Sequence, residues 1–136
     1  MAETLTEPHP EGARQALETL DAYMATFNAH DWPRNAATLN YPHVRIAGGK
    51  VTTWNSADEY ARANPDRIGR TFERGWHHSA VDEREIVHSS ADKVHVALRF
   101  TRYDERGVAL ASYPSLWIVT LVDGHWGVQA RSSFAP

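Results

Sequence analysis

Residues 77–134 contain four segments of alternating apolar residues joined by three short turn sequences, whereas most of the preceding chain has helical spacing. The clearest strand pattern is residues 94–100, where valine, leucine and phenylalanine occupy every second position. The turn sequences are residues 89–92, 104–107 and 123–124. Helices followed by an antiparallel meander predict an α+β fold in which the helices cover one face of the sheet. A curved sheet covered in this way leaves space for a pocket.

The composition is that of a single soluble domain without a redox or nucleic-acid role. The 136 residues carry a net charge of −3 and no cysteine, which excludes disulfides and thiolate sites and argues against nucleic-acid binding. No segment has the ~20 apolar residues that span a membrane, and the first residues are not a signal peptide. We predict a flexible tail over residues 1–10, one domain over residues 11–136 and a cytoplasmic location.

Three helices and a hairpin are predicted before the meander. The apolar residues of segment 11–30 repeat at helical spacing, and Asp31 is a suitable N-cap for a short helix that runs to about residue 39. Ser56 with Glu59 forms a capping box that opens a third helix, which Pro65 kinks or restarts and which ends by Gly75. Between these helices, residues 43–54 form a hairpin that turns at the two glycines 48 and 49.

The third strand of the meander, residues 108–122, is apolar on both faces around residues 116–119. One face belongs to the core. We predict that a partner subunit covers the other face, so that the protein forms a homodimer through the outer face of the sheet. Pro114 lacks a backbone donor, so a bulge or bend is predicted there.

This order of elements resembles that of the nuclear-transport-factor-2-like superfamily, which includes ketosteroid isomerases, SnoaL-like polyketide cyclases, scytalone dehydratase and many bacterial proteins. The resemblance covers about residues 11–134, and the segments that carry it are 17–31, 41–46, 75–78 and 122–128. It implies that the chain is a bacterial-type member of this superfamily and has a cone-shaped α+β fold. In such a fold three N-terminal helices pack on a strongly bent antiparallel sheet, with an apolar pocket at the open end and dimerisation through the outer sheet face.

The chemistry of the best-known relatives is not implied. Ketosteroid isomerases have a general-base aspartate just past the second helix, where this chain has Ile46 and Ala47. Their second acidic residue lies on the long third strand, where this chain has residues 117–119, which are tryptophan, isoleucine and valine. Ketosteroid isomerase activity is therefore not expected, and cyclases that use an acid on that strand match poorly.

Three histidines are candidate catalytic groups: His43, His77 and His78. His77 and His78 are adjacent on a predicted strand, so they point to opposite faces and one is expected to face the cavity. A neutral histidine in a cleft is a suitable general base near pH 7. The alternative is a hydrogen-bonded histidine at the start of a strand.

The candidate ligand contacts are two arginines and five aromatic residues. His43 and Arg45 are two apart on one strand, so they share a face that is either the cavity or a solvated rim. Arg131 is near the end of the last strand, but parity places it opposite Trp126 and Val128 and so outward unless a bulge intervenes. The aromatic candidates are core or pocket lining, namely Tyr23, Phe27, Trp54, Trp76 and Trp117.

The sequence has no metal-ligand spacing among its eight histidines and no phosphate-binding glycine loop or nucleophile elbow, so no metal or cofactor is predicted. The leading hypothesis is a pocket that binds a small apolar ligand with a carbonyl or carboxylate group. In its enzymatic form a histidine acts as the base of a lyase or isomerase. The alternative is a non-catalytic dimeric interaction or scaffold domain.

Overall fold

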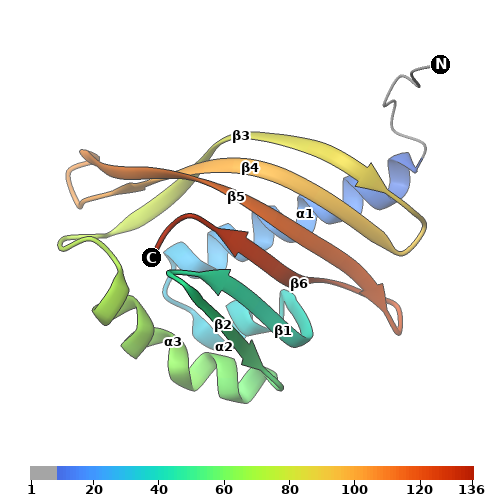
Figure 1. The fold of residues 1–136 in the computed structure, drawn as a ribbon, viewed down its shortest axis with the longest axis horizontal. Helices are drawn as coiled ribbons and strands as arrows, with labels where there is room; N and C mark the ends of the chain where they lie inside the picture. Colours follow the sequence, from blue (N-terminus) through green and yellow to red (C-terminus); the bar gives the residue numbers. More distant parts are fainter. Residues whose placement is uncertain (1–8) are drawn as a thin grey trace.

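The chain forms one curved six-stranded sheet with three helices against it (Figure 1). The computed structural model describes residues 9–136, and the predicted tail lies mostly outside them. The elements are α1 (Pro10–Asn28), α2 (Trp32–Ala36), β1 (Leu39–Ala47), β2 (Lys50–Trp54), α3 (Ala57–Thr71), β3 (His78–Ser89), β4 (Lys93–Tyr103), β5 (Ala109–Val122) and β6 (His125–Ser133). The predicted cone-shaped α+β fold is confirmed in its essentials.

The predicted helix starts are also confirmed. The Asp31 side chain accepts a hydrogen bond from the Arg34 backbone N–H at 3.2 Å and caps α2. The Ser56 hydroxyl accepts one from the Glu59 N–H at 3.2 Å and caps α3. Helix α3 continues through Pro65 and ends at Thr71, four residues before the predicted limit.

The sheet order is β2-β1-β6-β5-β4-β3, so the N-terminal hairpin and the C-terminal meander join into one sheet. Strand β1 pairs with β6 in parallel, and every other pair is antiparallel. The predicted antiparallel sheet therefore contains one parallel pair. β1, which follows α2, and β6, which follows the turn at residues 123–124, run side by side in the same direction (Figure 1).

The bulge predicted at Pro114 is not found, since Pro114 pairs with Arg99 without a register shift. Its carbonyl oxygen accepts a hydrogen bond from the Phe134 N–H at 3.2 Å, one residue past the end of β6. The missing N–H of the proline therefore faces Phe134, one residue beyond the end of β6. The register shifts beside β5 lie elsewhere: Leu110 is an extra residue of β5 opposite Arg102 and Tyr103, and the shift between Ile118 and Val119 comes from an extra residue on β6.

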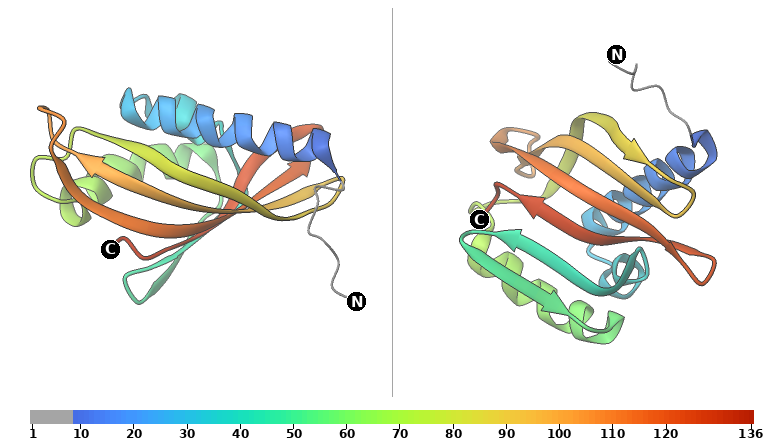
Figure 2. Two further views of the ribbon diagram at one scale, coloured as in Figure 1. Left: turned by 90° about the horizontal axis from the view of Figure 1, so that it is seen from above. Right: turned by 45° about the vertical axis from the view of Figure 1, so that its right-hand side comes forward.

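The two faces of the sheet differ in what covers them. Helix α1 crosses the inner face, where its buried residues Leu20 and Phe27 belong to the same core as Val96 of β4 and Val119 of β5 (Figure 2). No helix of residues 9–136 covers the outer face. No helix in this part of the chain combines the length and apolarity needed to cross a membrane. The inner face is therefore where helices and sheet enclose space.

Candidate functional site

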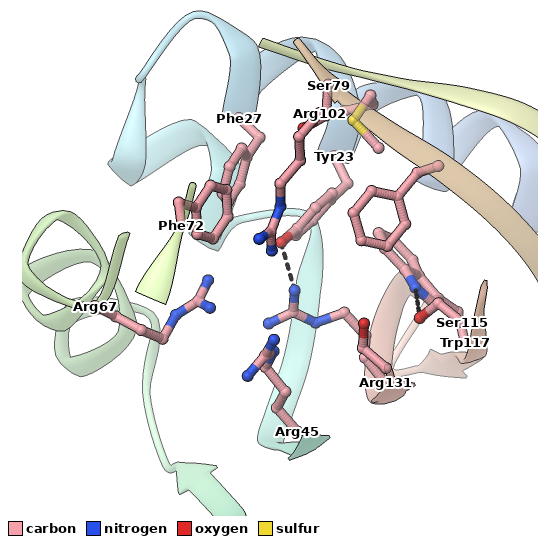
Figure 3. Close-up of a pocket in the computed structure, with 13 residues that line it drawn as sticks. Tyr23, Phe27, Arg45, Arg67, Phe72, Ser79, Arg102, Ser115, Trp117 and Arg131 are labelled. Atoms are coloured by element: carbon pink, nitrogen blue, oxygen red, sulfur yellow. Dashed lines mark hydrogen bonds between the residues drawn. The ribbon is translucent and has the colours of Figure 1, made fainter. Parts of the chain in front are cut away.

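A cavity of about 50 Å³ lies between α1, the end of α3 and the inner face of the sheet (Figure 3). This space holds roughly three to five water molecules, at 10–15 Å³ each. Aromatic side chains make up its apolar wall, namely Tyr23, Phe27, Phe72, Phe100 and Trp117. A cavity of this size fits a small ligand or one functional group of a larger one.

Four arginines from four different elements line the same cavity. Arg45 is on β1, Arg67 on α3, Arg102 on β4 and Arg131 on β6. Their exposed fractions are 8, 8, 2 and 6 %, so all four are buried. Figure 3 shows the four guanidinium groups pointing toward one another. Buried like charges repel, so such a cluster requires anionic partners or costs stability.

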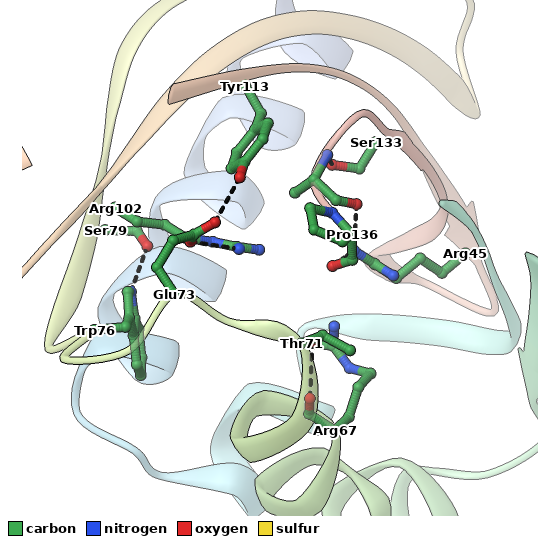
Figure 4. A network of polar contacts seen from close by, with 11 residues as sticks. Arg45, Arg67, Thr71, Glu73, Trp76, Ser79, Arg102, Tyr113, Ser133 and Pro136 are labelled. Carbon is green, nitrogen blue, oxygen red and sulfur yellow. Dashed lines mark hydrogen bonds and ion pairs between the residues drawn. The ribbon is translucent and has the colours of Figure 1, made fainter. Parts of the chain in front are cut away.

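Arg102 has an anionic partner. Its Nη1 donates to Glu73 at 2.8 Å, and the Tyr113 hydroxyl donates to the other carboxylate oxygen (Figure 4). Burial alone would raise the pKa of Glu73, but these two hydrogen bonds, a backbone hydrogen bond and the charge of Arg102 together lower that pKa below its usual value. The Arg102 guanidinium also lies 3.6 Å from the centre of the Phe72 ring. Glu73 therefore neutralises one of the four cations.

Arg131 lies at the centre of the cluster and is paired only with neutral groups. Its Nη1 donates to the Tyr23 hydroxyl at 2.6 Å, and its Nε donates to Nε2 of His43 at 3.0 Å. Its Nη2 is buried without a hydrogen-bond partner among the described residues, and the same is true of Nε of Arg102. Native proteins rarely leave charged donors unsatisfied, so these two nitrogens are available to donate to a bound acceptor.

Arg45 and Arg67 have no acidic side chain as a partner among residues 9–136. Arg45 donates to the backbone oxygens of Ala135 and Pro136, and Arg67 donates twice to the side-chain oxygen of Asn64. Burial, then the charges of Arg131 and Arg67, lower the pKa of Arg45 to about 9. Burial and the charge of Arg131 also lower the pKa of Arg67. Both shifts reflect burial and the mutual repulsion of the cations that line the cavity.

His43 is fully buried, and both of its ring nitrogens are engaged. Nδ1 lies 2.8 Å from the Val128 carbonyl oxygen, and Nε2 accepts from Arg131. Nδ1 therefore carries the proton, since a carbonyl can only accept. Burial, followed by the charge of Arg131, lowers the pKa of His43 to about 2. His43 is thus neutral, with no lone pair free for a ligand, and it orients Arg131.

The pKa of His43 predicts a loss of stability in acid. Below about pH 6.5 the unfolded chain protonates this histidine while the folded state stays neutral, so protons stabilise the unfolded state. Between pH 7 and pH 5 we expect His43 to remove about 2 kcal/mol from the free energy of unfolding. In urea denaturation, His43→Gln, which can keep both hydrogen bonds, should show a pH dependence shallower by this amount. Equal slopes would contradict the assignment.

The remaining candidate histidines do not line the cavity. His77 precedes β3, which begins at His78, and the Nδ1 atoms of the two rings lie 3.0 Å apart near the surface. The ring of His78 stacks on Tyr103. The expectation that one of the pair faces the cavity is therefore corrected, because His77 is outside the strand and the alternation of faces does not apply to it.

The other predicted site residues divide into two groups. Those that line the cavity are Tyr23, Phe27, Arg45, Trp117 and Arg131. Trp54 is 4 % exposed and packs against Tyr60 in the core, away from the cavity. Trp76 packs edge-on against Phe27 behind the cavity wall and donates to the Ser79 hydroxyl at 2.9 Å.

A β-bulge explains why Arg131 points inward despite its parity. Ile118 pairs with Ala130 and Val119 pairs with Val128, so Gln129 is an extra residue on β6. One extra residue reverses the alternation that follows it. Arg131 therefore lies on the same face as Val128, beside Arg45, with which it is paired in register.

Sequence reasoning missed Arg67 and Arg102, although a pattern pointed to each. The period-two alternation of residues 94–100 continues to Arg102 and places it on the apolar face. Arg67 follows Asn64 at helical spacing on the buried face of α3. A charged residue in phase with a core face is the feature that identifies both. Glu73 lies in the loop after α3, where periodicity carries no information.

The fold is shared with solved bacterial proteins of low sequence identity. A cystatin-like-fold protein of unknown function from Nostoc punctiforme has 13 % identity and a TM-score of 0.77, with 96 % of each chain covered. A ketosteroid isomerase-like protein from Erwinia carotovora has 24 % identity and a TM-score of 0.67, covering 93 % of this chain and 96 % of its own. A putative aromatic ring hydroxylase from Novosphingobium aromaticivorans has 10 % identity and a TM-score of 0.70, covering 93 % and 90 %.

No curated protein matches the chain by sequence. A family described as "NTF2-like protein (DUF6841)" matches residues 13–133, which include every residue that lines the cavity. The chain therefore belongs to this NTF2-like family.

Proposed function

We propose that the cavity binds a small organic anion, with the anionic group among the arginines and the apolar part against the aromatic wall. The observation that carries this proposal is the buried Nη2 of Arg131, which has no hydrogen-bond partner within residues 9–136 and lies among four guanidinium groups. A carboxylate-type ligand would supply both the missing acceptor and the missing negative charge.

The enzymatic form of the hypothesis has less support than binding. A lyase or isomerase that uses a histidine base needs a free imidazole nitrogen beside the ligand. Both nitrogens of His43 are engaged, and His77 and His78 lie outside the cavity lining. The proposed function is therefore anion binding, without an assigned proton-transfer step.

The test is to compare matched anionic and neutral ligands. Acetate and acetamide have similar shapes, as do butyrate and butyramide, but only the acids carry charge. In low-salt buffer we expect the acids to raise the melting temperature. At a ligand concentration of 100 Kd, the free energy of unfolding should increase by about 2.7 kcal/mol. The amides should have little effect. Equal shifts for acid and amide would overturn the proposal.

We also propose that the outer sheet face forms a homodimer, which is the basis of the alternative interaction role. Uncharged residues occupy this face in register across three strands, with Ile118 beside Ala130 and Ala130 beside Val44. Nearby, Leu116 is 40 % and Ile46 is 50 % exposed. Contiguous exposed apolar side chains of this kind are typical of protein interfaces.

Light scattering at micromolar concentration should give twice the monomer mass, and Leu116→Asp should reduce it to the monomer mass. Val108→Asp is the matched control, because Val108 is 56 % exposed but lies in the turn between β4 and β5. This control should remain dimeric. A monomeric wild-type protein would contradict the dimer proposal without affecting anion binding.

A further inference from the structure

The charge balance of the cavity is more specific than a preference for anions. Arg45, Arg67, Arg102 and Arg131 contribute four positive side chains, and Glu73 is the one acidic side chain paired with them among residues 9–136. Three guanidinium groups are thus left without a side-chain counter-charge. A carboxylate ligand would neutralise only one of them.

The arrangement of the three remaining guanidinium groups differs from that of a carboxylate site. A planar carboxylate is matched by the two parallel donors of a single arginine. Here Arg45, Arg67 and Arg131 approach one space from β1, α3 and β6 (Figure 3). Donors that converge from three directions match a tetrahedral group with three acceptor oxygens.

Enough donors are available for such a group. Arg131 has a buried Nη2 without a partner. Arg45 uses only one terminal nitrogen in its hydrogen bonds, and Arg67 uses Nε and one terminal nitrogen. Each guanidinium therefore retains at least one donating nitrogen, and the cavity of about 50 Å³ has room for a single head group.

We propose that the ligand of this cavity carries a dianionic tetrahedral head group of the phosphate or phosphonate class, held by Arg45, Arg67 and Arg131. This inference rests on the proposed anion binding and specifies its ligand. Glu73 acts as the residue that sets the preferred ligand charge, because its pairing with Arg102 removes the fourth positive charge.

Methylphosphonate and acetate test the inference, because each places one methyl group on the anionic centre but the first carries two charges at about pH 8. By isothermal titration calorimetry of the wild-type protein at low salt, methylphosphonate should bind at least about tenfold more tightly than acetate. Inorganic phosphate serves as a third probe, and binding weaker than that of methylphosphonate would indicate an organic ligand. Binding stronger than that of methylphosphonate would overturn the organic class and leave inorganic phosphate.

Two variants of α3 provide a matched pair. Arg67→Gln removes one guanidinium of the three, whereas Arg62→Gln makes the same charge change at a side chain that is 79 % exposed. Arg67→Gln should reduce the preference for methylphosphonate over acetate by about tenfold, and Arg62→Gln should leave it unchanged. Circular dichroism of both variants checks the fold.

The possible failures are distinguishable. If acetate binds as tightly as methylphosphonate, the dianion inference is overturned and the proposed anion binding stands. If neither anion binds, both proposals are overturned. If Arg62→Gln changes the preference as much as Arg67→Gln, the selectivity arises from overall charge, and the assignment to the cavity is overturned.

Discussion

Replacing Arg45 with methionine is expected to weaken anion binding by about 30-fold while raising the melting temperature of the ligand-free protein. Arg45 is 8 % exposed, and its surroundings in the cavity are cationic. A charge-assisted hydrogen bond contributes about 1.5–3 kcal/mol, which corresponds to roughly 10- to 150-fold in affinity. Removing this buried cation is in contrast expected to stabilise the ligand-free protein, because burial and the charges of Arg131 and Arg67 both oppose its charged form.

The opposite signs of these two effects identify an arginine kept for binding rather than for folding. Arg45 is preferable to Arg131 for this test, because Arg131 also holds His43 and Tyr23. Calorimetric titration and thermal unfolding of the same sample measure both effects. Arg62→Met on the surface of α3 is the control and should change neither quantity by much. A destabilised Arg45→Met protein with unchanged affinity would show that the arginine is structural.

Substituting Gly127 with alanine is expected to cost about 3 kcal/mol of folding free energy and to lower the melting temperature by roughly 10 °C. A Cβ atom at this position would lie 2.7 Å from the Leu39 carbonyl carbon and 2.8 Å from the Asn40 backbone nitrogen. These are backbone atoms at the start of β1, where the Val128 N–H donates to the Thr38 oxygen at 2.9 Å. The only relief is to separate β1 from β6.

The neighbouring strand has little freedom to make that movement. The Asn40 side-chain amide donates to the backbone oxygens of Thr120 at 2.9 Å and His125 at 3.2 Å, which ties β1 to β5 and to the start of β6. Gly69→Ala is the control, because no heavy atom lies within 4 Å of its added Cβ and alanine favours a helix by about 1 kcal/mol. We expect opposite signs for the two substitutions in urea denaturation, and a tolerated Gly127→Ala would contradict the close approach.

The helix starts and the strands of the meander could be predicted because each depends on residues adjacent in sequence. Capping by Asp31 and Ser56 involves groups three residues away, and the alternation along β4 reflects one strand on one face. The shared face of His43 and Arg45 follows from the same alternation, and both are buried. These local rules also explain why Arg102 was predictable in principle.

The candidate site was predicted only in part, because its residues are brought together across the sheet. Arg131 faces inward only through the extra residue Gln129, and a bulge has no reliable sequence signature. Glu73 reaches Arg102 from a loop whose path depends on where α3 ends. The histidines were favoured for their general chemistry, whereas the hydrogen bonds that occupy His43 became visible only in the folded chain.

By itself, the sequence determined the α+β arrangement, the order of its elements and the absence of the carboxylates used by ketosteroid isomerases, because periodicity, capping and composition are local properties. The tertiary structure alone decided that four arginines line one cavity and that Glu73 pairs with one of them, Arg102. They lie on four elements separated by up to 86 positions, from Arg45 to Arg131, and no local pattern links them. Electrostatic character depends on distances in space, so the cationic cavity became evident only in the fold.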